Sequence, residues 1–155
     1  MRLRMVLLLS LALPAVGHAT TIDTTFTSAG VPIHYLESGS GPPVILIHGW
    51  SADLHMWDDI RARLAAKYEV VALDCRGHGR SGKPHEPSAY GIEMVNDVVR
   101  LLDHLAIKQA NVVGYSMGGS IALKMLETHP ERLLSVVSGA SEGFRPGQRS
   151  GIRWS

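Results

Sequence analysis

Residues 111–119 have the sequence Asn-Val-Val-Gly-Tyr-Ser-Met-Gly-Gly, the most informative pattern in the chain. An apolar run leads into a serine with a glycine two positions away on each side, in the pattern Gly114-x-Ser116-x-Gly118. Small residues at these positions allow a strained turn, the nucleophile elbow, which lifts the serine hydroxyl above the end of a strand. The stretch therefore predicts a strand, a sharp turn and a helix, with Ser116 beside the free N–H groups of the helix start.

The composition predicts one globular domain. The chain has 155 residues, of which 45% are hydrophobic and 19% charged, so it can bury a substantial core. The formal net charge is +1 and no segment carries a block of one sign. We therefore expect no nucleic-acid partner, because such partners require a clustered basic surface.

Residues 1–19 have the layout of a secretory signal peptide. The segment begins with Met-Arg-Leu-Arg, continues with apolar residues 5–13, and ends with a proline and small residues. Because the apolar run is shorter than the roughly 20 residues of a membrane-spanning helix, we expect cleavage after Ala19 and no stable membrane span in the mature chain. A periplasmic or secreted location follows. Cys75 is the only cysteine, which excludes an intramolecular disulfide.

Beyond Thr25, strand-like and helix-like stretches alternate. The predicted strands are short apolar or β-branched runs, and the predicted helices repeat apolar residues every three or four positions. Strands joined by such helices imply right-handed crossovers and a mainly parallel sheet with flanking helices, which is an α/β fold. We expect a hairpin of strands 25–28 and 33–37 that turns at Gly30-Val31-Pro32, strands at 44–47, 70–73, 110–113 and 133–137, and helices at 54–68, 90–106 and 117–128.

Three of the predicted strands end at chemically distinctive motifs. His48-Gly49-Trp50 follows the first apolar strand, the glycine-rich loop from Asp74 to Ser81 follows the next, and Ser116 follows a third. Ligands of parallel sheets bind at the carboxyl ends of the strands. The three motifs are therefore expected to lie on one rim of the sheet.

As a set, and in this order, the three motifs resemble those of the α/β-hydrolase superfamily. The resemblance covers about Thr25 to Ala140. It is most similar to the branch that holds small esterases, haloperoxidase-like enzymes and carbon–carbon bond hydrolases.

The resemblance implies a role for each motif. Ser116 would be the nucleophile that attacks a carbonyl and forms an acyl-enzyme. The backbone N–H groups of Trp50 and Met117 would form the oxyanion hole. The turns that hold these groups would depend on three glycines, Gly49, Gly114 and Gly118.

The resemblance also narrows the substrate class. Dehalogenases and epoxide hydrolases of this superfamily have an aspartate at the nucleophile position, so Ser116 favours small-molecule carboxylic esters and related acyl substrates, with carbon–carbon bond cleavage still open. The Asp74 to Ser81 loop and His48 would have structural roles rather than take part in the chemistry. No cofactor and no metal are expected, because the sequence lacks a phosphate-binding loop with its lysine and any His- or Cys-rich ligand spacing.

The residues that follow Ser116 do not complete a catalytic triad. In this superfamily an acid and a histidine come later in the chain, but the sequence after Ser116 has no aspartate and one histidine, His129. A helix rises about 1.5 Å per residue, which puts His129 roughly 20 Å from the serine, whereas a base must come within about 3 Å. The sequence thus predicts a partial hydrolase domain at 20–141, without the last strands and the cap, and a loop-like or disordered tail at 142–155.

Two functions remain open from the sequence. One is a secreted serine hydrolase, of which this chain is an incomplete version; the other is a non-catalytic remnant or small-molecule binding module that keeps the hydrolase pocket. In either case the strand at 133–137 would be an open apolar edge. Such an edge favours self-association.

Overall fold

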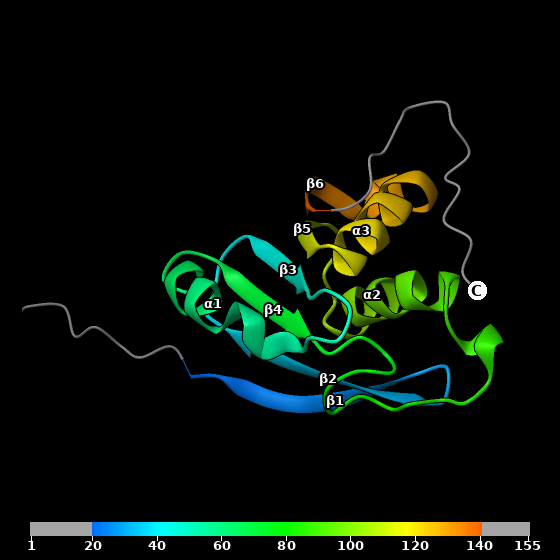
Figure 1. Ribbon diagram of the computed structural model, residues 1–155. Helices are drawn as coiled ribbons and strands as arrows, with labels where there is room; N and C mark the ends of the chain where they lie inside the picture. Colours follow the sequence, from blue (N-terminus) through cyan, green and yellow to red (C-terminus); the bar gives the residue numbers. More distant parts are fainter. Residues whose placement is uncertain (1–19, 141–155) are drawn as a thin grey trace, which may run out of the picture.

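The computed structural model describes residues 20–140, which form a six-stranded sheet with helices packed against it (Figure 1). The predicted α/β class with a mainly parallel sheet is confirmed. The predicted signal peptide and the predicted tail lie outside the described residues. The strands are β1 (Ile22–Ser28), β2 (Val31–Ser38), β3 (Pro43–Ile47), β4 (Glu69–Leu73), β5 (Ala110–Tyr115) and β6 (Leu133–Gly139).

The strands lie in the order β1-β2-β4-β3-β5-β6 across the sheet. The pairs β4/β3, β3/β5 and β5/β6 are parallel, whereas β1/β2 and β2/β4 are antiparallel. Every strand predicted from the sequence is present, and each of the six extends beyond its predicted bounds by one to three residues. The order places β3 and β5 side by side, so the motifs that follow these two strands become neighbours.

The hairpin turns one residue earlier than predicted. Its two loop residues are Ala29 and Gly30, with φ of 47° and 82°, and Ser28 pairs with Val31 across the turn. A two-residue hairpin turn with positive φ at both positions matches the right-handed twist of its strands. Pro32 cannot adopt such a φ, because its ring fixes φ near −65°, and it lies in β2 instead.

The predicted helix at 54–68 is two shorter pieces, a 3₁₀-helix η1 (Leu54–Trp57) and α1 (Asp58–Leu64). The Asp53 carboxylate accepts a bond from the His55 N–H and caps η1. Ile60, one of the apolar residues that recur at three- and four-residue steps in this stretch, is 45% exposed. The spacing therefore predicted helical structure here correctly, but it predicted one helix that is longer than either of the two observed.

The other two predicted helices are α2 (Ile92–His104) and α3 (Met117–Thr128), with short 3₁₀-helices η2 (Pro87–Ala89) and η3 (Pro130–Arg132) ahead of α2 and after α3. The bounds of α3 agree with the prediction. Helix α2 begins two residues later than predicted, because Gly91 has φ of 66° and stands outside the helical region.

Two apolar layers hold the helices to the sheet. Side chains alternate along a strand, so Ile45 and Ile47 pack on one face with α2 and α3, and Val44 and Leu46 pack on the other with η1 and α1. Burying an aliphatic side chain of this size contributes about 1.5–3 kcal/mol. Because β3 is buried on both faces, its carboxyl end is a rigid platform for the residues that follow it.

A buried ion pair ties the loop after β4 to α2. The Arg76 guanidinium is 2% exposed and donates two bonds to the Asp97 carboxylate, at 2.6 and 2.5 Å. Arg76 also donates to the Ala89 carbonyl, and the Ser28 hydroxyl donates to Asp97 at 2.5 Å. Fork-shaped pairing of this kind fixes both position and orientation. The ion pair therefore fixes the base of the loop against the helix.

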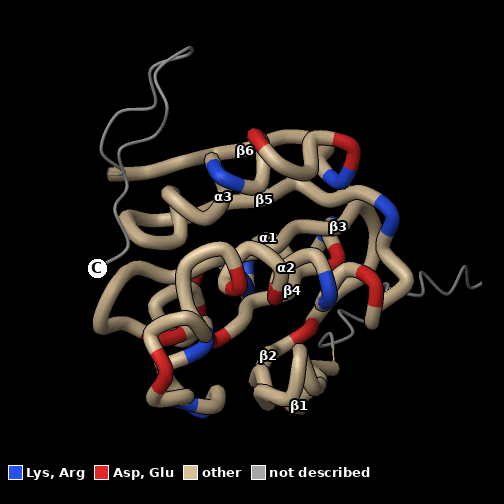
Figure 2. Tube along the Cα trace, turned by 90° about the vertical axis from the view of Figure 1, so that its right-hand side faces the viewer, with Lys and Arg blue, Asp and Glu red and all other residues tan. Residues whose placement is uncertain are grey.

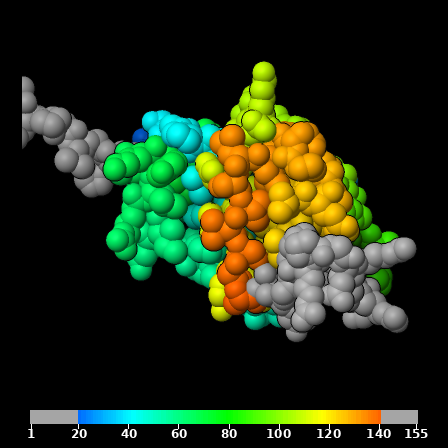
Figure 3. Space-filling model, turned by 90° about the horizontal axis from the view of Figure 1, so that it is seen from above, coloured from blue at the N-terminus to red at the C-terminus, as the bar shows by residue number. Residues whose placement is uncertain are grey.

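Among residues 20–140, strand β6 is an edge of the sheet with exposed apolar side chains. Leu134 is 54% exposed and Val137 is 56% exposed, and no charged residue occurs between Leu133 and Gly139. Figure 3 shows β6, in orange, open to view from above. Elsewhere in the described residues, charges of both signs are interspersed (Figure 2). None of the helices in residues 20–140 is long and apolar enough to cross a bilayer.

Replacing Asp97 with alanine should lower the free energy of unfolding by about 3–5 kcal/mol, because the Arg76 guanidinium stays buried and loses its bidentate carboxylate partner. The Glu93 carboxylate, 3.7 Å from Arg76, is the ion-pair partner that remains. Urea unfolding followed by circular dichroism measures this change.

The matched control is Asp103→Ala on the same helix. Asp103 is 63% exposed in its pair with Arg132, and an exposed pair is worth less than about 1 kcal/mol. Equal losses for the two variants would show that burial of the Arg76–Asp97 pair is not what matters.

Candidate active site

The three sequence motifs meet at the carboxyl ends of neighbouring strands, as predicted. His48 follows β3, Asp74 follows β4 and Ser116 follows β5. Because β4, β3 and β5 are consecutive in the sheet, their carboxyl ends form one rim. Three of the five non-glycine residues with positive φ in residues 20–140 lie near this rim. They are Ser51, Ser116 and Ala140, with φ of 56°, 50° and 53°. Non-glycine residues with positive φ are costly and cluster at functional sites.

Ser116 occupies a strained turn between β5 and α3. Its φ is 50° and its ψ is −112°, outside the regions that serine ordinarily adopts. The Ser116 N–H donates to the Gly139 carbonyl at the end of β6 at 2.7 Å, and its carbonyl accepts from the Ser120 N–H in α3. The strand before and the helix after therefore hold the turn, and the side chain is half-buried at the rim.

Two glycines make this turn sterically feasible. A Cβ on Gly114 would lie 2.1 Å from the Gly118 carbonyl oxygen, and a Cβ on Gly118 would lie 2.2 Å from the Ile47 carbonyl oxygen. Real Cβ atoms do not approach backbone this closely. The glycines therefore let the first turn of α3 pack directly on the ends of β5 and β3.

The segment after β3 lies against the serine. A Cβ on Gly49 would be 3.4 Å from the Ser116 Cβ and 3.1 Å from the Tyr115 ring. Within residues 20–140, neither the Trp50 N–H nor the Met117 N–H donates to another backbone group. Met117 is buried, whereas the Trp50 side chain is 72% exposed. Two free amide donors are thus carried by the segments on either side of the serine.

His48 supports the segment rather than facing the serine. Its Nδ1 donates to the Gly49 carbonyl at 2.7 Å, and its Nε2 accepts from the Cys75 N–H at 3.0 Å. Burial lowers the pKa of His48 below its usual value. Both ring nitrogens of the neutral imidazole are occupied, so His48 joins the ends of β3 and β4. The sequence analysis expected a structural role for His48 but not this link.

Asp74 is a buried carboxylate that binds three separate segments. It accepts bonds from the Leu54 N–H, the Arg80 N–H and the His34 ring, each at 2.8 Å. Although burial raises its pKa, the two N–H groups and the His34 ring outweigh that effect and hold the pKa below the ordinary aspartate value. With its oxygens engaged in this way, Asp74 has the structural role expected of it.

The His34 link was missed from the sequence. The other ring nitrogen of His34 lies 2.9 Å from the Asp23 carboxylate in β1, and Asp23 also pairs with Arg80 at 2.8 Å. These contacts join residues up to 57 positions apart. Nothing in the local sequence pattern marks them, because the pairings of β1 with β2 and of β2 with β4 bring His34 beside Asp23 and Asp74.

Neither a base nor a metal cluster accompanies Ser116 in the described part of the chain. Between residues 20 and 140, no other side chain hydrogen-bonds to its hydroxyl, and no group of three or more His, Cys, Asp or Glu could hold a metal ion. His129 follows α3 at its far end, where its ring bonds to the Thr128 hydroxyl at 2.8 Å. The exclusion of His129 as the base agrees with this position.

Residues 42–151 match the model of the alpha/beta hydrolase fold family. The chain belongs to that family. A curated relative is the dihydrolipoyllysine-residue acetyltransferase component of the acetoin cleaving system of Cupriavidus necator, with 38% identity over 79% of this chain and 33% of that protein. Bifunctional epoxide hydrolase 2 of Sus scrofa is 37% identical over 70% of this chain and 20% of its own length.

Solved structures of the α/β-hydrolase family are also similar. An epoxide hydrolase from Vigna radiata superposes with a TM-score of 0.78 and 28% identity, over 84% of this chain and 42% of that one. A membrane phospholipase A described as a bacterial virulence factor gives a TM-score of 0.72 and 30% identity, over 83% and 42%. The chain spans a third or less of the two curated relatives and less than half of the two solved structures.

Gly118→Ala should destabilise the protein by about 3 kcal/mol or more, because the added methyl group would overlap the Ile47 carbonyl oxygen. Helix propensity alone predicts the opposite sign, since alanine is favoured over glycine by about 1 kcal/mol. Thermal unfolding measures the difference.

Gly139→Ala is the control, since a Cβ there would find its nearest neighbour, the Tyr115 ring, at 3.6 Å. The control should stay within about 0.5 kcal/mol of the parent. A stable Gly118→Ala protein would mean that α3 does not pack on the end of β3 in this way.

Proposed function

We propose that this chain carries the nucleophile and oxyanion hole of a serine hydrolase that acts on carboxylic esters or related acyl compounds. The observation that supports the proposal most is the strained turn at Ser116, flanked by the free amides of Trp50 and Met117. A strained conformation persists only where surrounding structure enforces it. An exposed rim with an oxygen nucleophile and two donors suits acyl transfer.

The chemistry follows from these groups. The Ser116 Oγ would attack the substrate carbonyl carbon, and the carbonyl oxygen would become an oxyanion that accepts bonds from the Trp50 and Met117 amides. Collapse of this intermediate expels the alcohol and leaves an acyl-enzyme, which water then hydrolyses. The Oγ proton needs a base, and residues 20–140 offer no side chain bonded to the hydroxyl.

Several relatives are named as epoxide hydrolases or as a fluoroacetate dehalogenase. The serine at position 116 favours a different reaction for this chain. If Ser116 attacked an epoxide or halide carbon, the product would be an ether without a carbonyl, and water could not release it by acyl hydrolysis. Attack on a carbonyl gives an ester, which can turn over. The similar dihydrolipoyllysine-residue acetyltransferase component has a name that refers to transfer of an acyl group.

The amino-terminal sequence supports export as part of the proposal. Residues 1–19 have the basic, apolar and small-residue regions of a signal peptide. We therefore propose that the hydrolase acts in the periplasm or outside the cell on a small-molecule substrate.

An alkyl fluorophosphonate probe tests the nucleophile directly. The probe should modify Ser116 of the full chain, located by peptide mass spectrometry, and Ser116→Ala should abolish the modification. The reaction should be slow, because residues 20–140 place no base at the Ser116 hydroxyl, and a serine triad without its base turns over about a millionfold more slowly. Ser120→Ala, one helical turn further along α3, should react like the parent.

Modification at other serines with Ser116 untouched would overturn the proposal and favour the non-catalytic binding module. Rapid modification that depends on Ser116 would strengthen it, since such a rate needs a base.

We also propose that the edge strand β6 mediates self-association. Its seven residues are uncharged, and Leu134 and Val137 are exposed. Natural edge strands avoid pairing by carrying charges, especially lysine. In β6 that protection is absent.

Val137→Lys should therefore shift the protein toward monomer in light scattering coupled to size exclusion. Thr25→Lys on the exposed face of the opposite edge strand β1 is the control and should leave the mass unchanged. A parent protein that is monomeric at all concentrations would contradict the proposal.

A further inference from the structure

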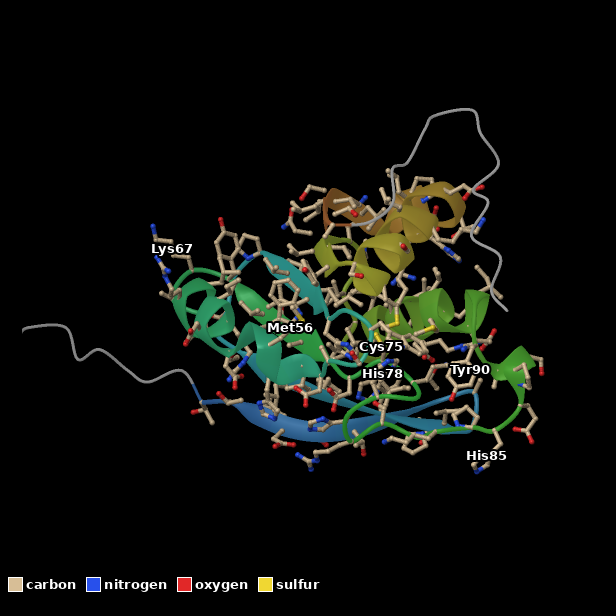
Figure 4. All side chains as sticks on the ribbon, viewed as in Figure 1. Met56, Lys67, Cys75, His78, His85 and Tyr90 are labelled. Atoms are coloured by element: carbon tan, nitrogen blue, oxygen red, sulfur yellow. The ribbon has the colours of Figure 1, made fainter. Side chains whose placement is uncertain are left out.

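We propose that His78 is a positioning residue for the Trp50 amide. The inference rests on the proposed function, in which that amide stabilises an oxyanion. His78 lies in the loop after β4, beside Cys75 and far from His85 (Figure 4). It does not belong to the elbow or to the segment after β3. Its proposed positioning role rests on its ring contacts with His48 and Trp50.

The His78 ring lies against two rings of the segment after β3. Its centroid is 5.1 Å from the His48 ring, at an interplanar angle of 60°, and 5.2 Å from the Trp50 indole, at 80°. Edge-to-face geometry at this separation is the favoured arrangement of aromatic rings. Within residues 20–140, His78 supplies the one aromatic contact of Trp50, whose side chain is otherwise largely in solvent.

His78 is itself held firmly. Its Nδ1 lies 3.1 Å from the Arg76 carbonyl, and its N–H donates to the Cys75 carbonyl at 2.9 Å. Arg76 is locked to Asp97 in α2 by the buried ion pair. The ring that contacts Trp50 is therefore connected to the helical layer rather than to a free loop.

The other links to this segment act on its backbone rather than on the Trp50 side chain. The Ala52 N–H donates to the Gly49 carbonyl at 3.3 Å and closes a turn that contains Trp50 and Ser51. His48 bonds to Gly49 and to the Cys75 amide, and Asp74 bonds to the Leu54 amide. These contacts hold the two ends of the segment, whereas Trp50 is between them and Ser51 has a strained φ of 56°. The His78 ring, in contrast, contacts the side chain of Trp50.

Position matters strongly at an oxyanion donor. Loss of one such donor lowers the rate about a hundredfold to a thousandfold, and a misplacement of about 1 Å can cost about a hundredfold. A residue that holds the donor should therefore affect the bond-forming step more than the initial binding of the substrate or probe.

The first test is structural and needs no activity. In ¹⁵N-labelled full chain, the backbone and indole N–H resonances of Trp50 are assigned by their loss in Trp50→Phe. His78→Ala should shift both resonances, because the ring is removed and the segment relaxes. His85→Ala, in an exposed part of the same connection, should shift neither. Unchanged Trp50 resonances in His78→Ala would overturn the inference.

The second test is kinetic. Fluorophosphonate modification of Ser116 is resolved into a binding constant and a limiting rate. His78→Ala should lower the limiting rate about tenfold to a hundredfold and change the binding constant by less than about twofold. His78→Phe keeps a ring at the contact and should recover most of the rate. An equal loss in His78→Phe, or a loss confined to binding, would overturn the positioning role.

The two tests separate the two proposals. If Ser116 reacts in no variant, the proposed function fails, and the Trp50 resonances still decide whether His78 sets the conformation of the segment. If Ser116 reacts and the His78 variants match the parent, the proposed function stands and the inference fails.

Discussion

The contact between Gly118 and the backbone at the end of β3 is the constraint on which the site depends. The first turn of α3 packs so closely on Ile47 and His48 that no side chain fits between them. This approach brings the start of the helix, with its free N–H groups, beside the segment that carries Trp50. It also leaves Ser116 no relaxed conformation, since the preceding strand and the following helix are both fixed. Strain at the serine is thus a consequence of packing.

The surroundings of the rim are held by buried charge rather than by further apolar contacts. Asp74 gathers Leu54, His34 and Arg80, and the Arg76–Asp97 pair joins the same loop to α2. Buried carboxylates are tolerated only when their oxygens are satisfied. Asp74 with its three partners and the Arg76–Asp97 pair therefore each fix one arrangement of the loops. The rim keeps its shape because any other arrangement would leave a charge without a partner.

The sequence allowed the sheet and the strained turn at Ser116 to be predicted, because both depend on local signals. Continuous apolar runs identified β3, β4 and β5, and the glycines around Ser116 identified the elbow. The hairpin turn at Ala29 and the split before α1 were predicted wrongly, since both are settled by pairing and capping rather than by periodicity. The contact of His34 with Asp74 was not predictable, because it depends on the register of two strands distant in sequence.

The buried thiol of Cys75 has a practical consequence for experiments on this fold. Cys75 is 3% exposed beneath the rim, and burial raises the pKa of its thiol well above the usual value. Thiolate is the form that reacts with alkylating agents, so the folded chain resists modification at its single cysteine. Modification then requires the structure around the end of β4 to open locally, and the rate of alkylation reports how often that opening occurs.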